Sequence, residues 1–150
     1  MGLLSKLFGK KSITLEEADK INKDYIAKNP EPKNDESALV RQASSLCTSG
    51  EFSKSLDLYL QLAEDYPNSK GLYLSQVGVN YYFLNDFNAA IDYYLKALDE
   101  GADSSMMDDN IWEACEALFN NDNDMAPINR YLELFPDGSY KKKANKILSK

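Results

Sequence analysis

The chain has 150 residues, of which 43% are hydrophobic and 27% charged, and its formal net charge is −7. This size and composition predict one folded domain and exclude wholesale disorder; a membrane-spanning helix is also excluded, because no run of about 18 apolar residues occurs. Histidine is absent, which disfavours zinc sites and histidine-dependent catalysis, and the two cysteines fit small buried hydrophobes in a reducing compartment.

The charge is unevenly distributed along the chain. Residues 1–11 hold three of the 17 basic residues and residues 138–150 hold five, and neither segment contains an acidic residue. The body between them therefore has nine basic and all 24 acidic side chains, a net charge of −15. Because such a body repels phosphates, we expect a basic or neutral protein partner and no nucleic acid.

The N-terminal segment, residues 1–13, has the pattern of a short basic amphipathic helix. Such a helix can lie on an anionic membrane surface, although a length of about ten residues makes the contact weak. A flap packed on the domain and a frayed terminus are the other interpretations. No secretory signal is recognisable, so we expect a cytoplasmic protein, either free or peripheral at the inner face of the membrane. The membrane-contacting residues would be Leu3, Leu4, Leu7 and Phe8.

A helix is predicted to begin after Thr14. Thr14 and Glu17 form a capping box, in which each side chain accepts a hydrogen bond from the backbone amide of the other. Apolar residues at helical spacing continue the helix to about Lys28, and Asn29-Pro30 ends it. Residues 14–34 are therefore an N-terminal helix and linker, set apart from a domain over 35–150.

That domain repeats a helical hairpin after 35 residues. The first hairpin has helices over about 36–49 and 53–65, and Gly50 ends the first of them. The second hairpin is clearest over residues 80–98, with a turn at Asn85-Asp86. Small residues are expected where helices approach closely, and they are Ala43, Gly78, Ala90 and Ala97.

A third, degenerate pair follows. Ser104 or Ser105 is expected to cap its first helix, residues 120–124 to form a polar turn, and Pro127 to lie in the first turn of its second helix. A closing helix over 140–148 is expected to cover the last apolar face of the domain.

The repeating pairs resemble tetratricopeptide repeats. Two clear repeats span about 36–69 and 71–102, and the usual period of this family is about 34 residues. The resemblance implies an all-α, right-handed solenoid of helical hairpins, with an extra N-terminal helix and a C-terminal capping helix. The residues that carry it are Leu39, Ala43, Leu46, Gly50, Phe52, Tyr59, Pro67, Leu74, Gly78, Tyr81, Phe87, Ala90, Tyr94 and Ala97.

The resemblance also implies a binding groove, because the first helix of each hairpin lines the concave face in this family. Val40 and Ser44 stand where some members have the cationic residues that clamp a C-terminal carboxylate, so that binding mode is not expected here. An apolar groove with an acidic rim instead suits a basic, amphipathic segment. The groove residues would be Val40, Ser44, Cys47, Ser75, Val79, Tyr82 and Phe83, with core packing as the alternative for Tyr82 and Phe83.

Three carboxylates of the third pair share a helix face: Asp109, Glu113 and Glu116 follow at i, i+4 and i+7. They could form a docking face for basic residues, a solvated face or an acid–base pair. No nucleophile motif, phosphate-binding loop or metal-ligand cluster accompanies them. We therefore expect no enzyme activity, no cofactor and no metal.

The function expected from the sequence is that of a non-enzymatic adaptor that holds a peptide or helix of a partner protein in the groove. The alternative is an acidic inhibitor of the immunity type, which would block a basic partner by charge complementarity. In a third interpretation the helix over 15–28 occupies the groove and regulates it.

Overall fold

The computed structural model describes residues 14, 17, 20, 24 and 35–150, which belong to two units, Met1–Asp35 and Glu36–Lys150. The predicted helix over 15–28 lies for the most part outside the described residues, as does the basic segment over 1–13.

The predicted capping box is present in the first unit. The Thr14 amide donates to Oε2 of Glu17 at 2.9 Å, and the Glu17 amide donates to Oγ1 of Thr14 at 3.2 Å. These reciprocal bonds satisfy two backbone donors at the start of a helix, which confirms the helix start that the sequence indicates.

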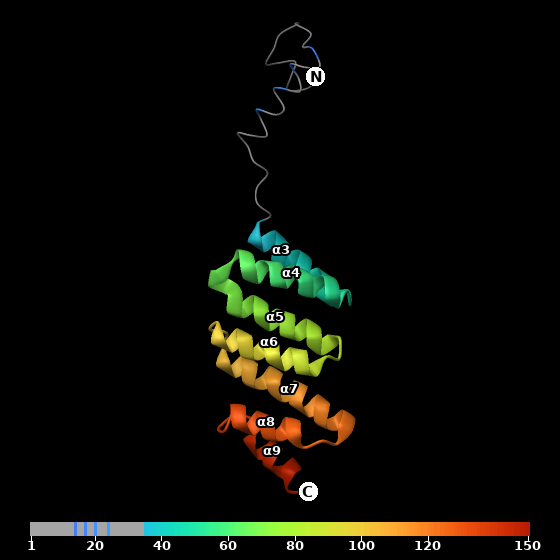
Figure 1. Cartoon of the computed structure of the whole chain (residues 1–150), viewed down its shortest axis with the longest axis vertical. Helices are drawn as coiled ribbons and strands as arrows, with labels where there is room; N and C mark the ends of the chain where they lie inside the picture. The colour runs from blue at the N-terminus through green and yellow to red at the C-terminus, as the bar shows by residue number, and fades with distance from the viewer. Residues whose placement is uncertain (1–13, 15–16, 18–19, 21–23, 25–34) are drawn as a thin grey trace. The chain divides into compact units, whose positions relative to one another are not determined.

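The second unit is all-helical, with no strand over residues 36–150. The helices succeed one another in chain order (Figure 1), and each packs chiefly on the helix before and the helix after it, with a further contact between α5 and α7. The elements are α3 (Glu36–Thr48), α4 (Phe52–Asp65), the 3₁₀ turn η1 (Pro67–Ser69), α5 (Lys70–Phe83), α6 (Phe87–Asp99), α7 (Ser104–Asp122), α8 (Ala126–Leu134) and α9 (Lys141–Leu148).

The turns inside the first two pairs have the same local geometry. After α3, Gly50 has a φ of +82°, and the next amide donates to the carbonyl of Leu46 at 2.8 Å. After α5, Asn85 has a φ of 62°, and the next amide donates to the carbonyl of Tyr81 at 3.0 Å. A left-handed residue is needed for this helix ending, which is why Gly and Asn occupy the two positions.

Small residues lie at the helix–helix contacts of the first two pairs, as predicted. Ala43 is fully buried, and its carbonyl accepts a hydrogen bond from Oγ of Ser55 at 2.8 Å, which joins α3 to α4. At Gly78 a Cβ atom would lie 2.5 Å from the Tyr94 ring and 3.2 Å from the carbonyl oxygen of Ala90, so the α5–α6 contact leaves no room for a side chain there. The two sites are 35 residues apart, and so are their partners Ser55 and Ala90.

The third pair differs from the prediction at its start. Asp103 is the cap of α7, and its carboxylate accepts a hydrogen bond from the Met106 amide at 2.8 Å. Ser104 and Ser105 lie in the first turn of the helix instead. Asp and Ser are nearly equivalent as caps, so the sequence alone does not distinguish three neighbouring candidates.

The third pair also differs at its turn. The predicted turn over 120–124 is helical as far as Asp122, and Asn123, with a φ of 54°, ends the helix. Three polar residues therefore extend α7 by most of a turn, because helix formation tolerates polar side chains on a solvated face. Pro127 lies in the first turn of α8, as predicted.

A buried aromatic cluster connects α7, α8 and the segment that leads into α9. The Trp112 side chain is 1% exposed; its ring lies edge-on to Tyr131, at 5.0 Å between centroids, and is stacked on Tyr140 at 5.1 Å. The buried carboxylate of Asp108 accepts hydrogen bonds from the Tyr131 hydroxyl and, at 2.7 Å, from the Ser139 amide. These contacts fix the start of the closing helix against α7.

Candidate partner-binding surface

On α3, the predicted groove residues form a small and mostly polar face. Ser44 is exposed, whereas Val40 and Cys47 are half-buried. The Cys47 thiol lies near the Tyr59 hydroxyl of α4, and burial raises the pKa of both groups. This face offers a partner little apolar area.

On α5, three apolar residues form what we call the α5 stripe: Leu72, Val79 and Phe83. They follow at i, i+7 and i+11, so they share one side of the helix. The Leu72 side chain is 53% exposed, Phe83 is 51% exposed and Val79 is half-buried. The three residues span about three turns of helix, given 3.6 residues per turn, and the half-buried Gln76 lies between Leu72 and Val79 on the same side.

Ser75, which the sequence places on the same surface, is 1% exposed, and its hydroxyl donates to the carbonyl of Leu72 at 2.7 Å. A hydroxyl that is bonded within its own helix does not present a donor to a partner. The candidate surface on α5 is therefore corrected by removing Ser75 and adding Leu72.

Two exposed hydrophobic residues carry a sequence signal that motif matching overlooks. Leu72 precedes Val79 by seven residues, which is two helical turns, and Met106 follows Leu72 by 34 residues. Met106 is 47% exposed on the first turn of α7. A search for repeat spacing among the exposed apolar residues, rather than among the core positions, would have identified both Leu72 and Met106.

The aromatic residues at the end of α5 pack in a small cluster. The Phe83 ring stacks on Phe52 of α4, with 5.1 Å between centroids and 12° between planes. Tyr82 lies edge-on to both Phe83 and Phe87, at 5.9 and 5.2 Å. One face of Phe83 is thus covered while half of its surface is open, whereas Tyr82 contributes mainly to packing.

Tyr94 of α6 lies between the predicted surface residues of α5 and α7. Burial raises the pKa of Tyr94, and the neighbouring Glu113 carboxylate and Tyr82 hydroxyl raise it further. Glu113 on α7 and Tyr82 on α5 are therefore both close to one phenol, which brings two sets of predicted residues together. Cys47 and Tyr59 precede Tyr82 and Tyr94 by 35 residues, and in the first pair the Cys47 thiol likewise lies near the Tyr59 hydroxyl.

Two of the three carboxylates predicted on α7 contact the C-terminal segment of the same unit. Oε1 of Glu116 lies 2.6 Å from Nζ of Lys143, which also lies 5.2 Å from the centroid of Trp112. Burial raises the pKa of Tyr140, and a hydrogen bond to the Asp109 carboxylate raises it further. Glu113 remains exposed. The acidic face predicted for basic partners is therefore partly covered by the chain's own lysine and tyrosine.

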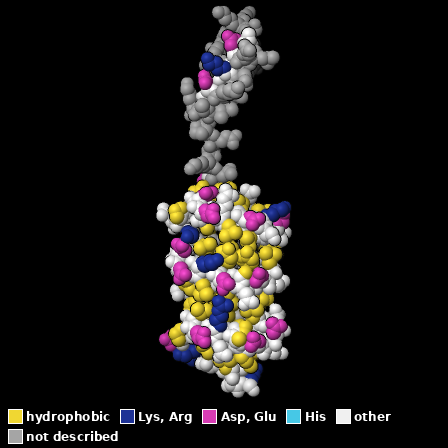
Figure 2. All heavy atoms as spheres, in the orientation of Figure 1, with side chains coloured by type: hydrophobic (Ala, Val, Ile, Leu, Met, Phe, Trp, Pro, Cys, Tyr) yellow, Lys and Arg dark blue, Asp and Glu magenta, His cyan; other side chains and the backbone are white. Residues whose placement is uncertain are grey.

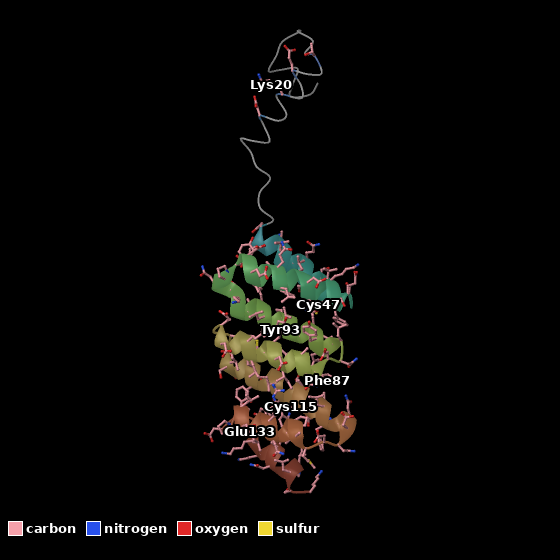
Figure 3. All side chains as sticks on the ribbon, in the orientation of Figure 1. Lys20, Cys47, Phe87, Tyr93, Cys115 and Glu133 are labelled. Carbon is pink, nitrogen blue, oxygen red and sulfur yellow. The ribbon has the colours of Figure 1, made fainter. Side chains whose placement is uncertain are left out.

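A second hydrophobic area extends over α4, α5 and α6 on the face drawn in Figure 2. Tyr93, labelled in Figure 3, contributes to it from α6. The Tyr93 ring is stacked on Tyr81 at 5.3 Å, and the ammonium of Lys96 lies 4.3 Å from its centroid. Because both neighbours already cover this ring, the α5 stripe with Met106 is the more open apolar surface.

The described residues present little reactive chemistry. Cys47 on α3 and Cys115 on α7 are free thiols far apart along the stack (Figure 3), and burial raises the pKa of Cys115 to about 11. Within the described residues, no group of three or more His, Cys, Asp and Glu side chains is placed to hold a metal ion. None of the described helices has the length and hydropathy needed to cross a membrane. Leu3, Leu4, Leu7 and Phe8 lie outside the described residues.

No protein-family model matches this sequence, and a search of curated proteins finds no similar chain.

Proposed function

We propose that residues 36–150 form a right-handed solenoid of two tetratricopeptide-like hairpins and a degenerate third pair, closed by α9. The turns at Gly50 and Asn85 have the same local geometry, which supports this arrangement. The helix contacts of Ala43 with Ser55 and of Gly78 with Ala90 also lie at equivalent positions. Both recur after 35 residues, and helices that pack on their neighbours in chain order are the pattern of repeat proteins.

The protein is then a non-enzymatic adaptor that binds a segment of a partner protein. The segment would lie across α3, α5 and α7, on the side that carries the α5 stripe and Met106. The observation that carries this proposal is the open α5 stripe, joined by Met106 at the start of α7. Exposed apolar residues scattered singly are ordinary, but a row of them on one helix face, with no described element over it, marks a contact surface.

The charge of the body favours a basic, amphipathic segment. Residues 12–137 carry a net charge of −15, and Glu113 is exposed near Tyr94 of α6. An amphipathic helix or extended peptide would place its apolar side chains on the stripe and its lysines or arginines over the carboxylates of α7.

The test is a selection of binding peptides from a random library with the full chain, followed by affinity measurement on two variants. Val79→Arg puts a charge in the centre of the stripe and should weaken binding at least tenfold. The matched control, Gln61→Arg, puts the same charge on an exposed position of α4 and should leave the affinity unchanged. Peptides that bind both variants as well as the wild type would contradict the proposal.

The acidic-inhibitor alternative is favoured by the net charge of the body, and salt dependence combined with Val79→Arg separates the two. Binding that rests on charge complementarity falls steeply as salt rises, whereas binding to the apolar stripe depends on it weakly. A partner that is lost at moderate salt yet insensitive to Val79→Arg would favour the inhibitor.

Peripheral membrane contact through Leu3, Leu4, Leu7 and Phe8 is a separate proposal. Vesicles containing anionic lipid should pull down the full chain and leave a version without residues 1–11 in solution. Equal recovery of both forms would end this proposal.

A further inference from the structure

A hollow lies between the first turns of α5 and α7, and the two exposed apolar residues of those turns belong to its wall. Its volume is about 330 Å³, at the lower end of the range for small-molecule sites. It is lined by Asn68, Ser69, Gly71, Leu72, Ser75, Glu100, Gly101, Ala102, Asp103 and Met106.

The hollow depends on small residues along its floor. A Cβ atom on Gly71 would lie 2.7 Å from the carbonyl oxygen of Glu100 and 2.9 Å from the amide of Ala102, so α5 touches the α6–α7 loop backbone at this point. The inward hydroxyl of Ser75 is already satisfied by the Leu72 carbonyl. The α5 backbone and the loop backbone thus close this side of the hollow.

The walls are apolar and open. Leu72 from α5 is 53% exposed and Met106 from α7 is 47% exposed, and both lie against the same hollow. They are among the four large hydrophobic residues that are exposed in the described part of the chain. An aromatic group inserted between them would bury both side chains, and the thioether of methionine makes favourable contacts with aromatic rings.

The rim of the hollow favours a cation over an anion. The Asp103 carboxylate accepts the hydrogen bond of the Met106 amide, so this donor at the start of α7 is already partnered by an acid. Glu100, at the end of α6, also lines the hollow and is paired with Lys70 at 2.5 Å. Two carboxylates therefore border the hollow, and one of them is paired with Lys70.

We propose that this hollow is the anchor site for one aromatic side chain of the bound segment, with a Lys or Arg next to that aromatic residue. This inference rests on the proposed adaptor function and specifies the residue that the partner must supply.

The test uses two indole compounds of opposite charge on full-length protein carrying ¹³C-methyl methionine. Tryptamine joins an indole to an ammonium, and indole-3-propionate joins the same ring to a carboxylate. We expect tryptamine to shift the Met106 methyl signal with millimolar affinity and indole-3-propionate to bind several-fold more weakly. The signals of Met107, which is fully buried, and of Met125, which lies at the α7–α8 turn, should not move.

Two substitutions of exposed leucines complete the experiment. Leu72→Asn removes one wall of the hollow and should weaken tryptamine binding at least fivefold. Leu84→Asn changes a leucine that is 42% exposed and does not line the hollow, and it should leave binding unchanged. The proposal is overturned if tryptamine leaves the Met106 signal in place, if Leu72→Asn has no effect, or if the anion binds as well as the cation.

The two proposals fail in different ways. If library peptides bind and are lost with Val79→Arg while tryptamine does not shift Met106, the adaptor function stands and the anchor site is wrong. If tryptamine binds as described but no peptide is sensitive to Val79→Arg, the hollow binds an aromatic cation but the groove proposal, and with it the anchoring role, is wrong.

Discussion

In the second helical pair, α5 and α6 meet at Gly78, whereas α7 of the third pair carries Trp112 at the position 34 residues later. The glycine leaves room for the Tyr94 ring to lie directly on the α5 backbone. Trp112 instead packs on the rings of Tyr131 and Tyr140, so contacts between large aromatic side chains hold α7 against its neighbours. The second pair is therefore held by a close approach of two helices, and the third pair by contacts between large side chains.

This difference has a consequence for the exposed faces. The α5 stripe lies on the closely packed pair, and its apolar side chains point away from it. On α7 the corresponding face is mostly acidic after Met106, and Tyr140 and Lys143 of the C-terminal segment contact two of its carboxylates. The C-terminal segment covers part of the acidic face of the third pair, whereas Leu72 and Phe83 of the second pair are exposed.

The largest effect is expected at the aromatic cluster. Trp112→Ala should lower the free energy of unfolding by about 3–5 kcal/mol, because it removes a fully buried ring and leaves a cavity. Phe83→Ala, at a half-exposed aromatic residue of the second pair, should cost no more than about 1.5 kcal/mol. Urea unfolding followed by circular dichroism measures both. Equal losses would contradict the asymmetry between the two pairs.

The next effect concerns the buried carboxylate that holds the closing segment. Asp108→Ala leaves the Tyr131 hydroxyl and the Ser139 amide without their acceptor and should cost about 1–3 kcal/mol. The exposed Asp57→Ala serves as the control and should change stability by less than about 0.5 kcal/mol. Hydrogen exchange should show the loss first in α9; uniform loss over the whole unit would argue against a local anchor.

A smaller effect is expected at the glycine contact. Gly78→Ala places a Cβ atom against Tyr94 and should cost about 1–3 kcal/mol, reduced by the better helix propensity of Ala, about 1 kcal/mol. Combining it with Tyr94→Leu should relieve the clash, so a double-mutant cycle should show coupling between the two positions. Strict additivity would mean that the close contact does not determine the packing of this pair.

These contacts mark the limits of prediction from sequence. The ends of α3 and α5 at Gly50 and Asn85 were predictable, because glycine and asparagine readily adopt the left-handed backbone conformation that ends a helix. The start of α8 was predictable because proline is favoured in the first turn of a helix. The continuation of α7 to Asp122 was not, since a polar run is compatible with both a turn and a solvated helix.

Long-range contacts were also beyond local patterns. The bond between Asp108 and Tyr131 joins residues 23 positions apart, and the stacking of Phe52 on Phe83 joins residues 31 apart. Of the candidate surface, Val79 was predictable from repeat spacing and Phe83 from a helical projection, whereas the burial of Ser75 depends on how α5 is rotated against its neighbours.

A last difference between the second and third pairs is expected in their stability at alkaline pH. Burial raises the pKa of Cys115 from 9.0 to about 11, and burial, reinforced by the hydrogen bond to Glu36, raises the pKa of Tyr73 from 10.0 to about 12. Folding therefore favours the protonated forms, and this stabilisation is complete below the unfolded pKa and is lost as pH rises through the folded one.

We expect the Cys115 contribution to disappear between pH 9 and 11 and that of Tyr73 between pH 10 and 12. The Cys115→Ala variant should lose stability less steeply than the wild type from pH 9 to 11, as measured by urea unfolding at each pH. Parallel curves would contradict the assignment to Cys115.

The central claim, that a partner segment lies along the α5 stripe, is tested most directly by thiol protection. Single-cysteine proteins with Val79→Cys or Gln61→Cys, both in a Cys47→Ser and Cys115→Ala background, are labelled with and without a saturating library-selected peptide. The account predicts that the peptide slows labelling at position 79 in proportion to the bound fraction and leaves position 61 unchanged. Unchanged labelling at position 79 with the peptide bound would contradict it.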